Sequence, residues 1–496
     1  MRRCPYIIVC VTVLLGLVSP ATAISLEPGR DGLAPQFTVG SVAVPATAKQ
    51  RQGVAPGTEP ALSLSKGPGA NKRFPPPEFE SGYVQPSPTT PAPRQDIYQY
   101  IDALVLLAAL GISAYLVLKR RSRSAIFALA VFSLLYFGFA RMGCVCSVGA
   151  IQNIVLSIFD RSYAVPIVVL AFFLLPLIFT LFFGRVFCAG VCPLGAIQDL
   201  VLVRPVRVPN WLEGALRLFA YVYLGAAILF AATGSAFIIC RYDPFVSFFR
   251  LSGNWNILTL GGSVLLVSVF VGRPYCRFVC PYGVILRQLS RISRWNVTIA
   301  PGRQDPAIVM TGLTGGPDEC IQCRLCEDSC PFGAIREPTA DWTGRDYSIG
   351  KKRLTLLMVL LPVLALSVGW AGSRLKNVTA RMHATVRLAE RVYLEDAGKA
   401  EGTTNASLAF RATGKPTEQL YAEASNIRAK FTLGGWFLGG FVGLIAGLKL
   451  IGLSRRVGRT DYEADRASCL ACGRCFEYCP KEHARRKGIG ATDFAD

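Results

Sequence analysis

The chain has 496 residues, enough for several domains, and 52% of them are hydrophobic while 17% are charged. This balance indicates a polytopic membrane protein. The formal net charge of +21 does not indicate a nucleic-acid partner, because Lys and Arg cluster at the ends of apolar stretches, as the positive-inside rule requires. The two histidines, His383 and His483, lie outside those stretches, which excludes a haem relay with axial histidines on the spans.

Residues 1–23 have the pattern of an export signal. Arg2 and Arg3 precede an apolar run, and Ala21-Thr22-Ala23 fits a small-residue cleavage site. The apolar run is only slightly short for a span, so the segment is either a cleaved signal or an uncleaved anchor. Residues 24–96 are rich in Pro and Gly and lack hydrophobic periodicity, which predicts an exported, disordered tether without a core.

The pattern predicts about seven membrane spans, at 97–118, 125–140, 165–183, 216–239, 255–272, 354–372 and 431–453. Lys119-Arg120-Arg121 follows the first span directly, which predicts that its C-terminal end faces the cytoplasm. Alternate counting then predicts that residues 184–213, 273–353 and the tail after 453 are cytoplasmic. The expected location is the bacterial cytoplasmic (inner) membrane.

A C-x3-C-P motif occurs twice within residues 97–300, the predicted transmembrane repeat domain. Cys188-Ala-Gly-Val-Cys192-Pro193 follows the third span, and Cys276-Arg-Phe-Val-Cys280-Pro281 follows the fifth, at an offset of 88 residues. Spans two to five are therefore interpreted as two copies of one unit. Pro at the first helical position, directly after a Cys, directs the thiol toward free backbone N–H groups at the helix start. These four cysteines form a candidate cytoplasmic-side thiolate site.

Three further cysteines, Cys144, Cys146 and Cys240, lie on predicted exported bends. They form a candidate exported-side thiolate site, in which another group would supply the missing ligand. For both membrane sets, a further iron–sulfur or metal site and a pair of redox-active disulfides remain open as interpretations.

Two runs have the C-x2-C-x2-C-x3-C-P spacing of bacterial 4Fe–4S ferredoxins, in which the fourth Cys of each run ligates the other run's cluster. The first is Cys320, Cys323, Cys326 and Cys330, and the second is Cys469, Cys472, Cys475 and Cys479. Zinc motifs usually have two C-x2-C pairs and a longer insert, so iron–sulfur clusters are favoured. The spacing predicts one cluster on Cys320, Cys323, Cys326 and Cys479, and another on Cys469, Cys472, Cys475 and Cys330.

Residues 301–353 and 454–496 are thus interpreted as halves of one cytoplasmic α+β ferredoxin domain. They are separated by residues 354–453, a predicted transmembrane hairpin with an exported helical loop at 373–430. The loop could cap the outer face, bind a partner or act as a solvated spacer. Cross-ligation predicts that the two halves meet on one side of the membrane.

The paired C-x3-C-P motifs and the two-cluster ferredoxin resemble the membrane polyferredoxins of the NapH, NosR and CcoG type, over residues 97–335 and 454–482. The resemblance implies two 4Fe–4S clusters and electron transfer between the quinone pool or cytoplasm and exported redox systems. The chain lacks a recognisable exported FMN-binding domain, and its ferredoxin is divided by a hairpin.

The leading functional hypothesis is a membrane-bound electron-transfer protein that passes single electrons between a cytoplasmic or quinol donor and an exported partner, such as a flavoprotein or cytochrome. It would be a component of an oxidoreductase system rather than a stand-alone enzyme. The alternative is a redox, metal-assembly or regulatory factor for an exported metalloenzyme. A transporter is disfavoured, because the spans lack the acidic and Lys side chains that mark ion paths.

Overall fold

The computed structural model describes residues 96–143, 146–161, 163–250, 255–299, 320–339, 344–454, 459 and 461–487. The predicted signal, almost all of the predicted tether and Cys144 lie outside the described residues. Two compact units are present. The first contains Tyr100–His383 and Ile427–Asp496, and the second contains Ala384–Asn426.

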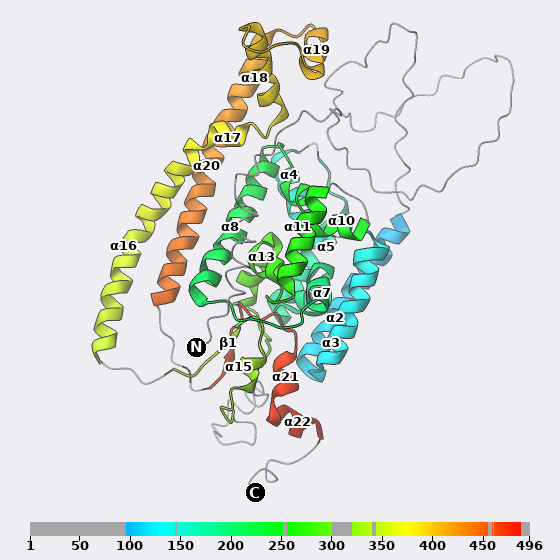
Figure 1. Cartoon of the computed structure of the whole chain (residues 1–496), viewed down its shortest axis with the longest axis vertical. Coiled ribbons are helices and arrows are strands. Elements are labelled where there is room, and N and C mark those ends of the chain that lie inside the picture. Colours follow the sequence, from blue (N-terminus) through cyan, green and yellow to red (C-terminus); the bar gives the residue numbers. More distant parts are fainter. Residues whose placement is uncertain are drawn as a thin grey trace, which may run out of the picture. The chain divides into compact units, whose positions relative to one another are not determined.

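Helices dominate the first unit (Figure 1). Its N-terminal part contains α2 (Asp96–Tyr115) with the π-helical extension η1 (Leu116–Arg120), α3 (Arg123–Ser133) with η2 (Leu134–Ala140), α4 (Ser147–Phe159), α5 (Ile167–Phe183), α6 (Val186–Gly190) and α7 (Pro193–Leu200). It continues through α8 (Asn210–Ala232), α9 (Ile238–Arg241), α10 (Pro244–Arg250), α11 (Trp255–Ser268), α12 (Pro274–Phe278) and α13 (Pro281–Ser290).

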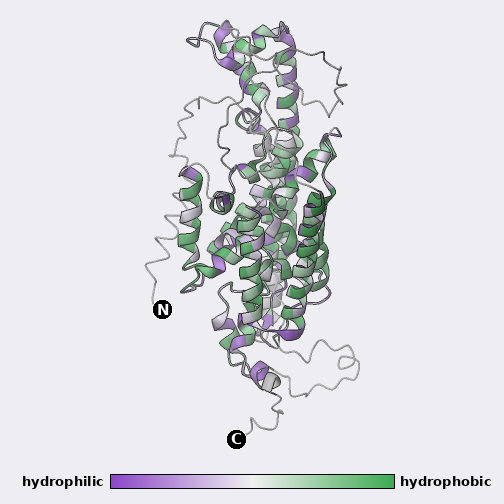
Figure 2. Cartoon of the chain, turned by 90° about the vertical axis from the view of Figure 1, so that its right-hand side faces the viewer, coloured by the Kyte–Doolittle hydropathy of each residue, from purple (hydrophilic) through white to green (hydrophobic). Residues whose placement is uncertain are grey.

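Five helical stretches are long and apolar enough to cross a membrane: Ile97–Arg120, Arg123–Ala140, Trp211–Ala232, Ile349–Arg374 and Thr417–Gly452. Hydrophobic residues accordingly make up much of these helices (Figure 2). The predicted spans at 165–183 and 255–272 form α5 and α11, which are shorter apolar helices. The chain is therefore a helical membrane protein, and the number of spans stays a prediction.

The predicted span at 216–239 differs from the structure at both ends. Helix α8 begins earlier, at Asn210, and stops at Ala232. Gly234 has a φ of +65°, a left-handed conformation that glycine adopts at low cost and that ends helices. The last residues of the predicted span therefore enter a turn and the short helix α9.

The hairpin predicted at 354–453 is built from α16 (Gly344–Arg374) and α20 (Thr417–Ser454). Their contact consists of glycines that face the other helix's backbone. A Cβ on Gly443 would lie 2.7 Å from the Leu364 oxygen, and one on Gly435 would lie 2.6 Å from the Gly372 oxygen. Small residues at four-residue spacing allow membrane helices to approach closely. Helix α20 also contacts α8, where the rings of Phe431 and Phe230 are 5.8 Å apart.

The ferredoxin halves meet in the structure. They contain α15 (Leu325–Ser329) and β1 (Ile335–Arg336) from the first half, and β2 (Glu463–Ala464), α21 (Arg474–Tyr478) and α22 (Pro480–Lys487) from the second. The two strands pair antiparallel, with Ile335 opposite Ala464, and α15 contacts α21. Segments on both sides of the hairpin thus form one α+β unit.

The short helix α17 (Lys376–Ala380) follows α16, and the second unit contains α18 (Ala384–Asp396) and α19 (Asn405–Ala412). The predicted loop at 373–430 is thus mostly helical, and α20 begins within it. The Glu395 carboxylate accepts from Arg391, Ser407 and Arg411 at 2.8, 2.8 and 3.2 Å, so α18 and α19 are joined by a buried acidic group.

Candidate iron–sulfur centres

The first predicted ligand set comes from both ferredoxin halves. Cys326 interacts electrostatically with Cys320 and Cys479, and Cys479 interacts with Cys323. Burial, and then the charges of these neighbouring thiols, raise the pKa of Cys326 to about 12. A thiolate here therefore needs a compensating cation, which iron supplies. The structure brings Cys479 to the first run, as cross-ligation requires.

The second predicted set, Cys330, Cys469, Cys472 and Cys475, lines a single cavity. Backbone N–H groups are directed at its sulfurs: Ala334 donates to Cys330 Sγ and Ala471 to Cys469 Sγ, both at 3.4 Å. Ala471 has a φ of +52°, so the chain turns and presents amides inward. Hydrogen bonds to cluster sulfurs are one means by which proteins tune iron–sulfur potentials. Ligation itself stays a prediction for both sets.

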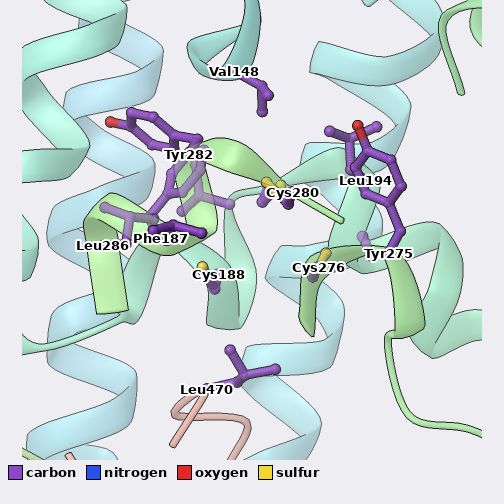
Figure 3. Packing of buried hydrophobic residues seen from close by; sticks show 14 of the residues in the cluster. Val148, Phe187, Cys188, Leu194, Tyr275, Cys276, Cys280, Tyr282, Leu286 and Leu470 are labelled. Atoms are coloured by element: carbon purple, nitrogen blue, oxygen red, sulfur yellow. The ribbon is translucent and has the colours of Figure 1, made fainter. Parts of the chain in front are cut away.

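Inside the helical unit, Cys188, Cys192, Cys276 and Cys280 are all buried, with 7 to 9% of each residue exposed. Cys192 and Cys280 directly precede α7 and α13, each of which begins with Pro. Gly283 donates to Cys280 Sγ at 3.3 Å. The sulfurs of Cys188 and Cys276 lie below Cys280 in Figure 3, and the charges of both thiols act on Cys280. The structure therefore brings the two C-x3-C-P motifs together.

Polar side chains hold this cysteine group in position. The Gln198 amide donates to Cys276 Sγ at 3.4 Å, and its oxygen accepts from the Tyr275 N–H at 3.1 Å. The Arg185 guanidinium lies 3.7 Å from Cys188 Sγ and also donates to the Ala467 carbonyl at 3.4 Å. Arg185 thus connects the group of Cys188, Cys192, Cys276 and Cys280 to the second ferredoxin half.

Arg273, which precedes the second C-x3-C-P motif, makes a similar connection. It is fully buried and pairs with Asp199, with its Nη2 2.6 Å from Asp199 Oδ2. It also donates to the carbonyl of Cys188 and interacts electrostatically with Cys276 and Cys472. Arg123 lies 3.8 Å from Asp199 and donates to the Cys472 carbonyl at 2.9 Å.

The second ferredoxin ligand set therefore adjoins the membrane cysteine group. Leu470, next to Cys469 in the chain, is 1% exposed and lies below Cys188 and Cys276 in Figure 3. On the other side of the same sulfurs lies Val148 (Figure 3), two residues after Cys146.

Two thiols of the predicted exported-side set, Cys146 and Cys240, belong to the described residues. Cys146 directly precedes α4, and Cys240 belongs to α9. Cys240 Sγ would lie 3.2 Å from a Cβ placed on Gly149, so it lies against the first turn of α4. These two described thiols are therefore neighbours.

In the described part of the chain, no three His, Cys, Asp or Glu side chains converge closely enough for a single metal ion. This holds for the ferredoxin cysteines as well. In a 4Fe–4S cluster each cysteine binds a different iron, so the ligands are spread more widely than around one ion. The second-set cysteines surround a common cavity, which is the arrangement that a 4Fe–4S cluster requires of its ligands.

Sequence reasoning assigned no role to Arg185 and Arg273. Their signal was present, because both follow a Gly and precede the first Cys of the repeated motif by three residues, at the same offset of 88. An Arg repeated in register with cysteine ligands is a candidate for charge compensation. Asp199, the buried partner of Arg273, had no comparable signal.

Comparisons with known proteins agree with this chemistry. A 4Fe–4S binding domain family matches twice, at residues 165–211 and 254–299, and so covers both C-x3-C-P motifs. A second family, also described as a 4Fe–4S binding domain, matches residues 316–336.

Two curated proteins are similar over about a quarter of the chain. Protein NirI of Paracoccus denitrificans is 28% identical over 137 residues, which are 27% of this chain and 18% of NirI. YccM of Escherichia coli, named as an electron transport protein, is 26% identical over 135 residues, 25% of this chain and 33% of YccM. The matched regions thus cover a third or less of each relative. No solved structure matches the chain.

Proposed function

Because the chain is an iron–sulfur protein of the ferredoxin type, we propose that it conducts single electrons across a membrane. The donor would be a cytoplasmic reductant or the quinone pool, and the acceptor an exported flavoprotein or cytochrome. When bound, 4Fe–4S clusters accept and release one electron at a time. The contact between the second ferredoxin ligand set and the buried Cys188 group is the observation that carries the proposal.

The residues would act as a series of binding sites. Cys320, Cys323, Cys326 and Cys479 hold the outermost centre, and Cys330, Cys469, Cys472 and Cys475 hold the next. Cys188, Cys192, Cys276 and Cys280 hold a third centre inside the helical unit. An apolar core of about 30 Å is long for one electron-transfer step, and an internal centre shortens the longest step.

Placement of the ferredoxin halves in the cytoplasm is supported by charge. Arg123, which bonds the Cys472 carbonyl, belongs to the basic stretch Lys119–Arg123 that ends the first span. Lys and Arg at span ends favour the cytoplasmic side. The inner membrane of a bacterium is the location that this orientation implies.

Iron analysis tests the proposal. With both ferredoxin clusters and the internal centre, the purified protein should contain at least about twelve iron and twelve sulfide, against about eight for the ferredoxin alone. Cys276→Ala should lower the iron count by about four. Ser268→Ala is the matched control, because this buried hydroxyl donates to Val264 of its own helix and bonds no other residue in the described part of the chain. A protein without a low-potential signal after reduction would overturn the electron-transfer proposal.

Transport of electrons is tested in sealed vesicles. Reductant outside and an impermeant oxidised acceptor trapped inside should react only through the wild-type protein. Cys276→Ala should slow this reaction strongly, and Ser268→Ala should leave it unchanged.

A second candidate function is delivery of electrons for assembly of an exported metalloenzyme. It is favoured by Cys146 and Cys240, which are half-buried. Reduction of the trapped acceptor by the wild-type protein fits both functions, whereas a requirement for a bound metal acceptor would favour assembly.

A further inference from the structure

A buried carboxylate, that of Asp243, lies beside the Cys146 and Cys240 thiols. Asp243 is 3% exposed, and its charge acts on both thiols. Cys146 and Asp243 line the same cavity, together with Ser147 and the apolar side chains of Phe137 and Phe172. Two thiols and a carboxylate from separate segments are thereby gathered inside the helical unit.

The negative charge of the Asp243 carboxylate is not neutralised by an ion pair within the described residues. Asp243 Oδ1 accepts the Phe245 N–H at 2.9 Å, but among the described residues Asp243 forms no ion pair with Lys or Arg. Arg250 acts electrostatically on Cys240, while its Nε donates to the Met142 carbonyl at 3.4 Å. A buried carboxylate without a paired cation is costly. A metal centre would supply the missing positive charge.

The cavity lined by Cys146 and Asp243 is larger than the cavity between the second-set ferredoxin cysteines. The cavity has a volume of about 30 Å³, compared with about 20 Å³ for the cavity lined by the four second-set ferredoxin cysteines. Cys192 of the internal cysteine group also lines it. The group containing Cys146 therefore adjoins the Cys188 group on the side away from Leu470, in agreement with the position of Val148 in Figure 3.

We propose that Cys146, Cys240 and Asp243 bind a further iron–sulfur cluster within the helical unit, with the Asp243 carboxylate in the place that a cysteine takes elsewhere. This inference rests on the proposed electron-transfer function and extends its series of centres toward the exported side. The sequence predicted thiolates here with one ligand missing, and Asp243 fits that position. Cys146 and Asp243 line one cavity, and Cys240 lies against the first turn of α4, the helix that Cys146 precedes.

Iron analysis of single variants tests this site. Cys240→Ala and Asp243→Asn should each lower the iron content of the purified protein by about four. Asp243→Asn keeps the shape of the side chain and an acceptor for the Phe245 N–H, so it should fold even where the cysteine variant does not. Ser147→Ala is the matched control, because Ser147 lines the same cavity and is not among the proposed ligands.

The electron paramagnetic resonance signals of the reduced ferredoxin clusters serve as the internal reference. If these signals persist and both variants contain as much iron as the wild type, the inference is wrong and the proposed function stands. A redox-active dithiol is then the better reading, and oxidation should protect Cys146 and Cys240 from alkylation. If the wild type lacks the ferredoxin signals, the proposed function itself fails.

Discussion

Arg185 and Arg273 occupy matching positions before the two C-x3-C-P motifs, and both are buried. Arg185 donates to the Ala467 carbonyl of the second ferredoxin half, and Arg273 donates to the carbonyl of Cys188. Reduction adds negative charge to a cluster, so a nearby guanidinium favours the reduced state. Arg273 interacts with Cys276 and Cys472 alike. Its single charge can therefore raise the reduction potential of two adjacent centres.

Replacement of Arg273 should lower the potentials of the neighbouring centres. In Arg273→Gln we expect a fall of roughly 60 mV, which corresponds to a tenfold change in a one-electron equilibrium. Loss of the guanidinium also leaves the negative charge of Asp199 less neutralised, which lowers the reduction potentials further. Redox titration followed by electron paramagnetic resonance measures the shift. Arg273→Lys should shift the potentials less, since it keeps the charge, and the exposed Arg291→Gln should not shift them. Equal potentials in Arg273→Gln and the wild type would contradict this role.

Cys479 has a role that its position in the sequence conceals. It lies in the second run but adjoins Cys323 and Cys326. In Cys479→Ala we expect loss or conversion of the cluster on the first run, while the cluster on Cys469, Cys472 and Cys475 keeps its signal. Cys330→Ala should give the opposite pattern. Spectra of the reduced variants distinguish the clusters, and damage to only the second-run cluster in Cys479→Ala would exclude cross-ligation.

At the scale of elements, the hairpin of α16 and α20 depends on glycine. A Cβ on Gly439 would collide with the Val368 carbonyl oxygen. The helices must therefore separate when this position carries a side chain. The rest of α16 has little contact with the protein, since 6% of its most apolar window is buried, so few other contacts resist the separation.

Gly439→Ala should destabilise the protein by about 1–3 kcal/mol, the usual cost of overpacking. Gly452→Ala provides the control, because nothing lies within 4 Å of its added Cβ, and we expect a change within about 0.5 kcal/mol. Thermal unfolding of both variants in the same detergent gives the comparison. Equal midpoints would show that the glycine contact does not stabilise the hairpin.

Sequence patterns located the elements better than their ends. Apolar stretches predicted every long helix, but the end of α8 depends on Gly234 in a left-handed conformation, which hydropathy averages do not detect. Helix α20 starts at Thr417 because a polar helix continues into the apolar one, and a hydropathy window registers only the apolar part.

At the scale of the whole molecule, spacing predicted which cysteines meet, because ligand motifs encode local geometry. The buried pairs that connect the sites were harder to predict. Asp199 meets Arg273, and Glu482 of α22 lies 3.0 Å from Arg121 at the end of α2 and η1. These partners are far apart in sequence and have no motif, so only the three-dimensional arrangement identifies them.

If the ferredoxin is split as proposed, the C-terminal segment is needed for two centres and is not needed for the others. A chain ending at Ser454 lacks the four second-run cysteines and β2, which pairs with β1. The first run then loses its fourth ligand, and Cys330 loses its three partners. We expect the iron content to fall by about eight, while the iron on Cys188, Cys192, Cys276 and Cys280 is retained.

A chain ending at Lys487 is the control, because it keeps every described ligand and all of α22. Its iron content should equal that of the full chain. If the chain ending at Ser454 still showed both ferredoxin signals, the first run would be self-sufficient and the two halves would not share clusters. If it lost all iron, the iron site at Cys188, Cys192, Cys276 and Cys280 would depend on the second ferredoxin half. The bond from Arg185 to the Ala467 carbonyl links the two regions.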